Sequence, residues 1–398
     1  MQSIPLTVPY WSYYEEDFEW PDHRLYRSAD PKQTLTVLQE AGMMETNAIQ
    51  YVKSGYVYCK ISGTIIDRYY GGALMSRDPR CRWTPEEFCE KSWRPQNGVK
   101  VFDARSWTEV RDLIEEQRKM VASPRRIFLR GQIMNYTLDR PVPNPSYVVQ
   151  GIGEISLMPN IWRKMLSKRS DSLHEFEPPP SILWSAILNR FYDAKDIERR
   201  RLDLVERGEW INSFQDMEDC EDEVLRNYGK LQLDLAYGSN VNLASTMVTL
   251  LEHYGLLSPV LDLTTEFEVA RFFATHKLQR TDDRWHYDFV GTNEGQSVIY
   301  VVKENPREMV EHQSAEAVIK IFDALRPQRQ GCVISMSSSF ALNLPAEFVV
   351  ALIRLDFKDD EGPVLNTKTL FPGADEDRFL KALQGVPISA TKLIDFPH

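Results

Sequence analysis

The pattern of apolar and polar positions predicts regular helices and strands from about residue 101 onward. A helix is predicted after Ser106, because apolar residues recur at helical spacing there and Ser106 and Glu109 have the spacing of a capping box. Pro124 ends this helix, and apolar runs at 127–129, 297–302 and 348–353 are typical of strands. Because helices and strands do not alternate as βαβ units, we expect an α+β fold. Its core would be a mixed or antiparallel β-sheet with flanking helices.

Residues 1–100 have a different composition, rich in tyrosine and tryptophan. Short β-leaning runs at 56–61 and 63–66 lie between glycine-containing turns. We therefore predict a small β-rich accessory unit at 1–100, followed by the main domain at 101–398. A partner protein is one candidate for what the accessory unit recognises.

The segment 250–274 holds the densest set of polar groups at predicted helix and strand ends. A helix ends at His253-Tyr254-Gly255, with Gly255 as its left-handed stop, and a short apolar strand and a second helix follow. Residues 265–268 have the spacing of a second capping box, so Thr265 is the predicted N-cap. Thr264, one residue earlier, is left to offer its hydroxyl to a ligand.

Arg130 and Asp262 are the charged residues with the clearest local context. Arg130 follows an apolar strand and precedes Gly131, so its guanidinium can approach a phosphate without crowding. A structural ion pair is the alternative for Arg130. Asp262 lies among leucines, so it needs a partner if buried, and a salt bridge to an arginine is the simplest one.

Three further residues are candidates for contact with a ligand or a reacting group. His253 lies in the last helical turn, where the helix dipole favours a protonated imidazole, although a single histidine is more often a packed core residue. Glu252 is either an acid or base or a solvated side chain. Gln330 precedes the strand at 332–335 and can hold a hydroxyl, but it cannot take up a proton; its alternative is a turn residue.

Composition narrows the classes of function. The net charge of −11 disfavours general attraction to nucleic acid, and no apolar run approaches the length of a membrane span. The first residues lack a basic region and a long apolar core, so we expect no signal peptide and a cytoplasmic location. No metal site is expected, and the cysteines are predicted to be free thiols because none has CxxC spacing: Cys59, Cys81, Cys89, Cys220 and Cys332.

Several blocks of the chain resemble the FRG domain in their order and residue types. The family's Phe/Tyr-Arg-Gly motif is similar to Phe128-Leu129-Arg130-Gly131-Gln132, with one leucine inserted. Its strongest block, Gln-His-Tyr-Gly-Leu followed by Leu-Asp-Trp-Thr, resembles 252–256 and 261–264. The remaining similar blocks are 156–163, 269–274, 330–331 and 370–372. Pro259 replaces the arginine that usually precedes the aspartate, so Asp262 is not expected to pair within this block. Leu263 replaces a tryptophan, and Glu252 a glutamine.

The order of these blocks is also similar to that of the ADP-ribosyltransferase fold. That similarity implies an NAD-dependent transferase or NAD-cleaving enzyme, with NAD as substrate and an unknown protein or nucleic acid as acceptor. Arg130 and Gly131 would hold the phosphates, Thr264 and His253 the ribose, and Tyr254 or Phe273 the nicotinamide ring. Gln330 or Glu252 would contact the ribose 2′-hydroxyl, with Glu252 as general base. A toxin or antiviral defence setting follows only by association with the fold.

Two alternatives to the enzyme stay open. In one, the core is a non-catalytic module that binds a nucleotide or a protein, and residues 1–100 recruit the partner. In the other, the protein processes nucleic acid, which the acidic balance makes less favourable.

Overall fold

The computed structural model describes most of residues 31–75, 98–159, 190–237, 249–311, 322–335 and 346–384. Within these ranges it leaves out 60–63, 68–70, 123, 251, 256–257, 259, 282–283, 294, 306–308 and 347, and it adds single helical positions at 86 and 187. The block 160–163 and the thiols of Cys81 and Cys89 lie outside the described part, so the predictions for them stay predictions. The side chain of Cys59 lies outside it as well.

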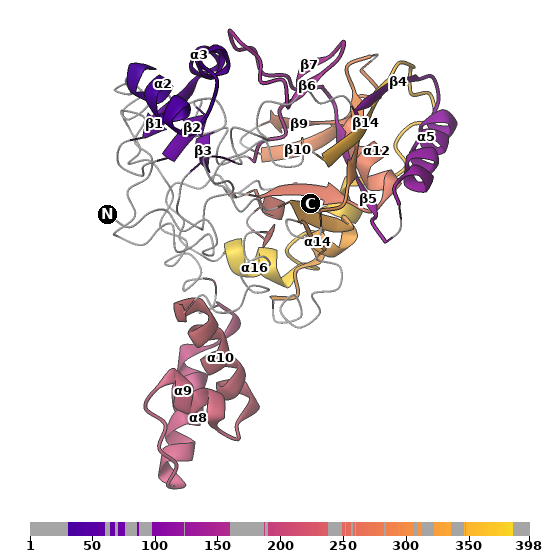
Figure 1. The fold of residues 1–398 in the computed structure, drawn as a ribbon. Coiled ribbons are helices and arrows are strands. Elements are labelled where there is room, and N and C mark those ends of the chain that lie inside the picture. The colour runs from indigo at the N-terminus through magenta and orange to yellow at the C-terminus, as the bar shows by residue number, and fades with distance from the viewer. Residues whose placement is uncertain are drawn as a thin grey trace.

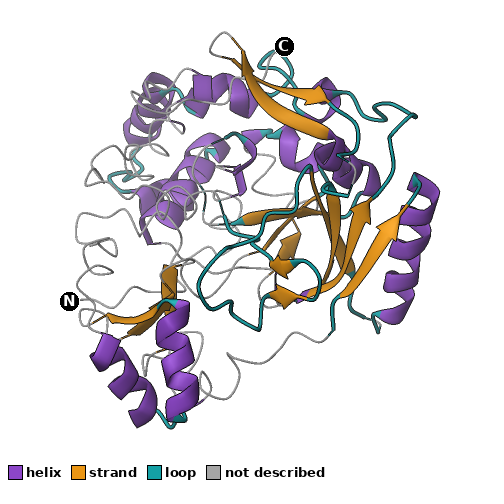
Figure 2. Cartoon of the chain, turned by 90° about the horizontal axis from the view of Figure 1, so that it is seen from above, coloured by secondary structure: helices purple, strands orange, loops and turns teal. Residues whose placement is uncertain are grey.

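A mixed sheet forms the centre of the described structure, in the order β12-β13-β8-β5-β11-β14-β4 (Figures 1 and 2). Its strands are β4 (Lys100–Ala104), β5 (Ile127–Gln132), β8 (Leu261–Thr264), β11 (Val298–Lys303), β12 (Met309–Glu311), β13 (Cys332–Ser335) and β14 (Val349–Leu355). Neighbouring strands are antiparallel except for β14 and β4, which are parallel. The predicted α+β class with a mixed core is confirmed.

Helices α5 (Trp107–Met120) and α12 (Phe267–Thr275) cover one face of this sheet. The Ser106 hydroxyl accepts a hydrogen bond from the Glu109 amide at 3.2 Å, so α5 begins at the predicted residue. Apolar side chains of the two helices pack against the sheet. The helices contribute Trp107, Val110, Ile114, Ala270 and Ala274, and strands β5, β11 and β14 contribute Leu129, Ile299, Val301, Ala351, Ile353 and Leu355. This packing presses α12 onto the strand that carries Arg130.

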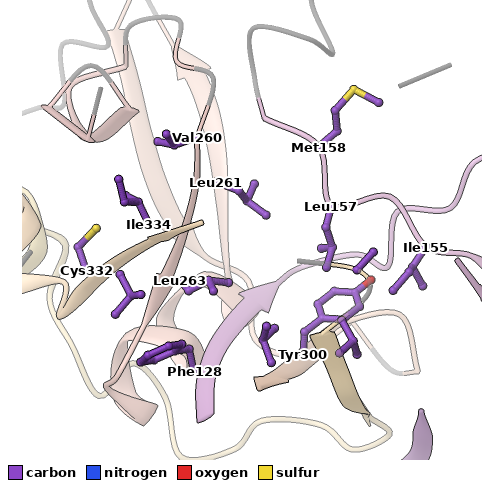
Figure 3. Close-up of a cluster of buried hydrophobic side chains, with 14 of the residues drawn as sticks. Phe128, Ile155, Leu157, Met158, Val260, Leu261, Leu263, Tyr300, Cys332 and Ile334 are labelled. Atoms are coloured by element: carbon purple, nitrogen blue, oxygen red, sulfur yellow. The ribbon is translucent and has the colours of Figure 1, made fainter. Parts of the chain in front are cut away.

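A larger cluster of buried residues covers the opposite face. It includes Phe128, Tyr300, Leu263 and Ile334 from the sheet together with Leu157 from the segment after the small hairpin β6 (Val148–Val149) and β7 (Gly153–Glu154). Figure 3 shows these side chains converging between the strands. The same cluster takes in Leu38, Ala48, Tyr51 and Tyr56 from the N-terminal part of the chain.

The described N-terminal part holds two helices in addition to the expected strands. These are α2 (Pro31–Glu40) and α3 (Glu45–Ser54), beside the three-stranded sheet of β1 (Tyr56–Cys59), β2 (Thr64–Asp67) and β3 (Gly71–Met75). The pattern of β-leaning runs missed both helices, because each of them is short and only weakly amphipathic. The boundary at residue 100 stays a prediction.

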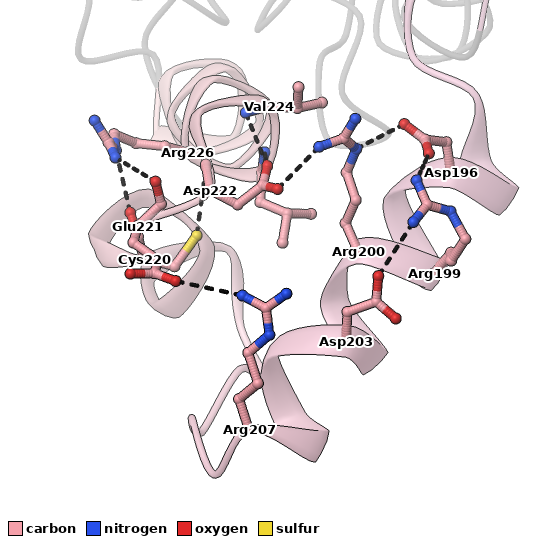
Figure 4. A network of polar contacts seen from close by, with 11 residues as sticks. Asp196, Arg199, Arg200, Asp203, Arg207, Cys220, Glu221, Asp222, Val224 and Arg226 are labelled. Atoms are coloured by element: carbon pink, nitrogen blue, oxygen red, sulfur yellow. Dashed lines mark hydrogen bonds and ion pairs between the residues drawn. The ribbon is translucent and has the colours of Figure 1, made fainter.

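Three helices form a separate bundle with its own small core (Figure 1). They are α8 (Ala194–Glu206), α9 (Phe214–Asp219) and α10 (Glu223–Tyr237). Arg199, Arg200 and Arg201 of α8 are ion-paired with acidic neighbours, as Figure 4 shows for Arg199 and Arg200. In the acidic run 216–223, Asp216 and Asp222 accept backbone hydrogen bonds at helix N-termini.

The remaining elements lie around the end of β8. They are the hairpin of β9 (His276–Thr281) and β10 (Arg284–Phe289), and the short helices α14 (Leu325–Arg329), α15 (Thr367–Leu370) and α16 (Arg378–Gln384). Within the described part of the chain, no helix combines the length and the hydrophobicity that a membrane span requires.

Candidate functional site

A cavity of about 330 Å³ lies where β5, β8, α12 and the β9–β10 hairpin meet. Its volume is at the lower end of the range for small-molecule sites. Fifteen described residues line it: Leu129, Arg130, Gly131, Glu252, His253, Gly255, Asp262, Leu263, Thr264, Val269, Phe273, Leu278, Tyr287, Gln330 and Phe371. Seven of the eight site residues proposed from the sequence are in this lining, and only Tyr254 is not.

Local backbone geometry explains how these distant residues meet. Gly255 has a φ of +78°, which ends the helix directly after Glu252 and His253, and β8 follows. Gly331, with a φ of +53°, turns the chain from α14 into β13, which pairs with β8. The Thr265 amide donates to the Gly331 carbonyl at 3.0 Å, which places Gln330 beside the end of β8.

Arg130 and Asp262 form the ion pair of this site. Nη1 of Arg130 donates to Oδ1 and to the carbonyl oxygen of Asp262, each at 2.6 Å. Burial raises the pKa of Asp262, but the Arg130 charge and its hydrogen bond outweigh burial, so the pKa lies below its ordinary value. The partner that the sequence could not supply within its own block is therefore Arg130, 132 positions earlier in the chain.

His253 is a packed residue with a neutral imidazole, and packing is the outcome that the sequence favoured. Burial lowers its pKa to about 4, and the charge of Arg326 acts in the same direction, although Asp262 and a hydrogen bond with Gln330 oppose them. Loss of solvent therefore outweighs the helix dipole. His253 Nε2 lies 2.9 Å from Sγ of Cys332, a geometry that resembles a nucleophile and its base. Cys332 is 1% exposed, outside the cavity lining, and burial raises its pKa, so it is a core thiol rather than a nucleophile.

Thr264, not Thr265, organises the start of α12. The Thr264 hydroxyl donates to the Gln330 carbonyl at 2.7 Å and accepts from the Glu266 amide at 3.0 Å. The capping box predicted for Thr265 is wrong, because the N-cap residue is Glu266 and the Thr265 hydroxyl donates to the Glu266 carboxylate. The hydrogen of the Thr264 hydroxyl is thus committed to the backbone. Gln330 is also held, since its Nε2 donates to the Leu370 carbonyl at 3.1 Å.

Aromatic side chains form one wall of the cavity. Tyr287 and Phe371 are stacked, with centroids 5.0 Å apart and an interplanar angle of 19°. Phe273 meets both rings edge-on, at 5.9 and 6.2 Å. Tyr254, expected in this role, is instead buried outside the lining, where its hydroxyl donates to Asp377 and the Arg326 guanidinium lies 4.6 Å from its ring centroid.

Carboxylates outnumber cations in the lining. Arg130 is its cation, His253 is neutral, and both Asp262 and Glu252 contribute carboxylates. The pKa of Tyr287 is raised, first by burial and then by the negative charge of Asp262. A neutral or cationic aromatic group therefore suits the cavity better than a bare anion does.

Neither a cluster of metal-binding side chains nor a disulfide bond is found among the described residues. No group of three or more His, Cys, Asp or Glu side chains there is arranged to hold a metal ion. Cys220 and Cys332 are both free and buried, in agreement with the prediction of free thiols for these two positions.

Comparison with known families identifies part of the chain. Residues 197–283 match the family model of the FRG domain. An FRG domain is present in this protein. The matched FRG residues begin in α8 and run past β9, so they include Glu252, His253, Thr264 and Phe273 but neither Arg130 nor Gln330. No curated protein and no solved structure matches the chain. The likeness of the FRG core to the ADP-ribosyltransferase fold stays a prediction.

Eight lining residues were not among the proposed site residues, and three of these eight are charged or aromatic: Asp262, Tyr287 and Phe371. Phe371 belongs to the Leu370-Phe371-Pro372 block that resembles the FRG family, so a signal was present. Tyr287 lies in a strand outside all the similar blocks, and Asp262 was treated only as a residue in need of a partner. Only the folded chain brings Tyr287 against Phe371.

Proposed function

We propose that the cavity binds NAD as a substrate and cleaves its nicotinamide–ribose bond, transferring ADP-ribose to an acceptor. The observation that carries this proposal is the convergence of residues near 130, 252, 264, 273 and 330 on one cavity. These positions were selected from their local sequence context and from the resemblance to the FRG domain, whose order of blocks is similar to that of the ADP-ribosyltransferase fold. A cavity of about 330 Å³ is sized for nicotinamide, its ribose and the adjoining phosphate, with the adenosine part of NAD outside.

The aromatic wall and the carboxylates suit the reacting part of NAD. Nicotinamide in NAD is a cationic aromatic ring, and Tyr287 and Phe371 offer stacked π faces beside it. As the bond between nicotinamide and ribose C1′ breaks, the electron pair goes to the ring nitrogen and the ribose becomes oxocarbenium-like. Negative charge from Asp262 and Glu252 would stabilise that positive charge.

We assign the acceptor's proton to Glu252. The nucleophilic atom of the acceptor, a protein, nucleic acid or water group, bonds to C1′ and loses a proton. Gln330 does not titrate, His253 has its pKa lowered to about 4, and Asp262 is ion-paired with Arg130, so Glu252 is the base in the lining best placed to take it. Thr264 acts indirectly, by holding the Gln330 backbone.

The decisive experiment is incubation of the purified protein with NAD labelled in the nicotinamide and in the adenosine part. We expect release of labelled nicotinamide, with Arg130→Ala and Glu252→Gln both losing it. Arg126→Ala is the matched control, because Arg126 directly precedes β5 and its ion pair with Glu304 is outside the cavity lining. If wild type neither binds NAD in calorimetry nor consumes it, the proposal is ruled out.

The alternative, a non-catalytic binding module, has one observation in its favour. The polar groups of Thr264 and Gln330 and one nitrogen of Arg130 already make hydrogen bonds within the protein. Such a module would bind NAD or ADP-ribose without releasing nicotinamide. Measuring binding and release on the same preparation therefore separates the two functions.

A further inference from the structure

The hydrogen bonds of Arg130 occupy only one of its three nitrogens. Nη1 has two hydrogens, and these account for its two bonds to Asp262, one to Oδ1 and one to the carbonyl oxygen. Nε of Arg130 is buried and makes no hydrogen bond with any described residue. No bond from Nη2 is found within the described part of the chain either. The Nε–Nη2 edge of the guanidinium is therefore the unused one.

A buried N–H without a partner requires an explanation, since nearly all such groups are bonded in folded proteins. The side chain of Arg130 is 16% exposed and lies in the cavity wall, where a ligand can reach it. The Nε–Nη2 edge presents two parallel N–H donors, which match two oxygens of one phosphate. An ordinary structural ion pair would use this edge for the carboxylate, because it gives a bidentate contact.

We infer that Asp262 is a positioning residue, which holds Arg130 by Nη1 and leaves its Nε–Nη2 edge for a phosphate of the ligand. This inference rests on the proposed function for the identity of the ligand and deepens it by assigning the phosphate contact. Asp262 needs only an oxygen acceptor for this role. Its negative charge opposes a nearby phosphate, so an uncharged acceptor of the same shape should serve at least as well.

The test is calorimetry of ADP-ribose binding, because ADP-ribose has the diphosphate and lacks the bond that the enzyme would cleave. We expect Arg130→Lys to weaken binding by about tenfold or more, since an ammonium cannot replace a bidentate fork. Asp262→Asn keeps Oδ1 and should bind ADP-ribose at least as tightly as wild type. Asp262→Ala loses the acceptor and should bind about tenfold more weakly.

Matched controls are Arg126→Lys and Asp103→Ala, two partly exposed members of other ion pairs that do not line the cavity. Both should bind ADP-ribose as wild type does. Affinities are compared per folded protein, with the folded fraction measured by circular dichroism, so a merely structural Asp262 would show normal affinity in Asp262→Ala. Should that variant fail to fold, the comparison of Asp262→Asn with Arg130→Lys decides.

The inference is overturned if wild type does not bind ADP-ribose, if Arg130→Lys binds as tightly as wild type, or if Asp262→Asn is as weak as Arg130→Lys. Failure of the proposed function looks different. In that case ADP-ribose binds with the expected dependence on Arg130 and Asp262, and NAD releases no nicotinamide. The opposite outcome is also distinguishable. If wild type cleaves NAD and Arg130→Lys binds ADP-ribose as tightly as wild type, the proposed enzyme activity holds and the assignment of Arg130 to the phosphate is wrong.

Discussion

The backbone of Gly131 lies directly against the carbonyl oxygen of Ala270. A Cβ at position 131 would be 1.7 Å from that oxygen and 3.0 Å from the amide nitrogen of Ala274. These atoms belong to the backbone of α12, so no side-chain rotation relieves the overlap. Gly131 therefore allows α12 to approach β5, and the Arg-Gly pair combines a cavity-lining side chain with a packing requirement. This packing is a stronger reason for glycine than access of a ligand to Arg130.

Gly131→Ala should destabilise the protein severely, by about 3 kcal/mol or more, because α12 must move away from the sheet. Chemical denaturation of the purified variant measures this. Gly98→Ala is the control, since a Cβ there meets nothing within 4 Å and should change stability by less than about 0.5 kcal/mol. Equal stability of Gly131→Ala and wild type would contradict the close approach of α12.

Replacing neighbouring threonines distinguishes the observed helix start from the predicted one. Thr264→Val removes a buried hydroxyl that joins the Gln330 carbonyl and the Glu266 amide, so it should cost about 1–3 kcal/mol. Thr265→Val changes a more exposed side chain and should stay within about 0.5 kcal/mol. Both are measured by urea denaturation. A larger loss in Thr265→Val would restore the capping box that the sequence suggested.

Local patterns were sufficient for the elements around the site. Ser106 begins α5 as its spacing with Glu109 indicated, and Gly255 ends the helix of His253 with a left-handed backbone. Both signals act within one helical turn, where residue type alone decides the geometry. The convergence of Arg130 and Gln330 on one cavity followed from the resemblance to a family rather than from local spacing.

Ion-pair and hydrogen-bond partners far apart in the chain could not be predicted from the sequence. Asp262 pairs with Arg130 across neighbouring strands, and neither local sequence identifies the other residue as its partner. The position of His253 at a helix end is visible in the sequence, whereas the depth of its burial, which lowers its pKa, is not. Thr265 was chosen as N-cap by spacing, but pairing of β8 with β13 brings Gln330 to Thr264 instead.

The aromatic wall gives a prediction for the ligand. Phe371→Leu keeps an apolar side chain but removes the ring stacked on Tyr287, so NAD should bind roughly tenfold more weakly. ADP-ribose, which lacks nicotinamide, should lose much less affinity in the same variant. Calorimetry with both ligands measures this difference. An equal loss for the two would place the nicotinamide ring elsewhere.

The lowered pKa of His253 should make the stability of the protein depend on pH. Its pKa is about 4 when folded, against 6.5 for an ordinary histidine, so between these values the unfolded chain binds a proton that the folded chain does not. Stability is therefore complete above pH 6.5 and falls as the pH drops toward about 4, by roughly 3 kcal/mol from this group. His253→Gln should have a shallower slope between pH 4.5 and 6.5 in urea denaturation. Parallel slopes for the two proteins would mean that the imidazole accepts a proton in the folded state.

Arg140 joins the N-terminal part of the chain to the β6–β7 hairpin through a fully buried network. Its side chain is 0% exposed and donates to Glu154 at 2.9 Å, to Asp67 at 3.1 Å and to the Ser54 carbonyl at 3.1 Å. Arg140→Met removes the cation that pairs with two buried carboxylates and should cost about 3–5 kcal/mol.

Hydrogen exchange should locate that loss. Because Ser54 and Asp67 lie in α3 and β2, protection should fall there first, before the central sheet opens. Arg118→Met removes an exposed ion pair with Glu115 and should cost about 0–1 kcal/mol without local loss of protection. Adding Asp67→Asn and Glu154→Gln to Arg140→Met removes the two buried negative charges that Arg140 paired with and should recover part of the stability. No recovery in the triple variant would show that Arg140 acts through its packing against Tyr56, whose ring centroid lies 5.9 Å from the guanidinium, and not through charge.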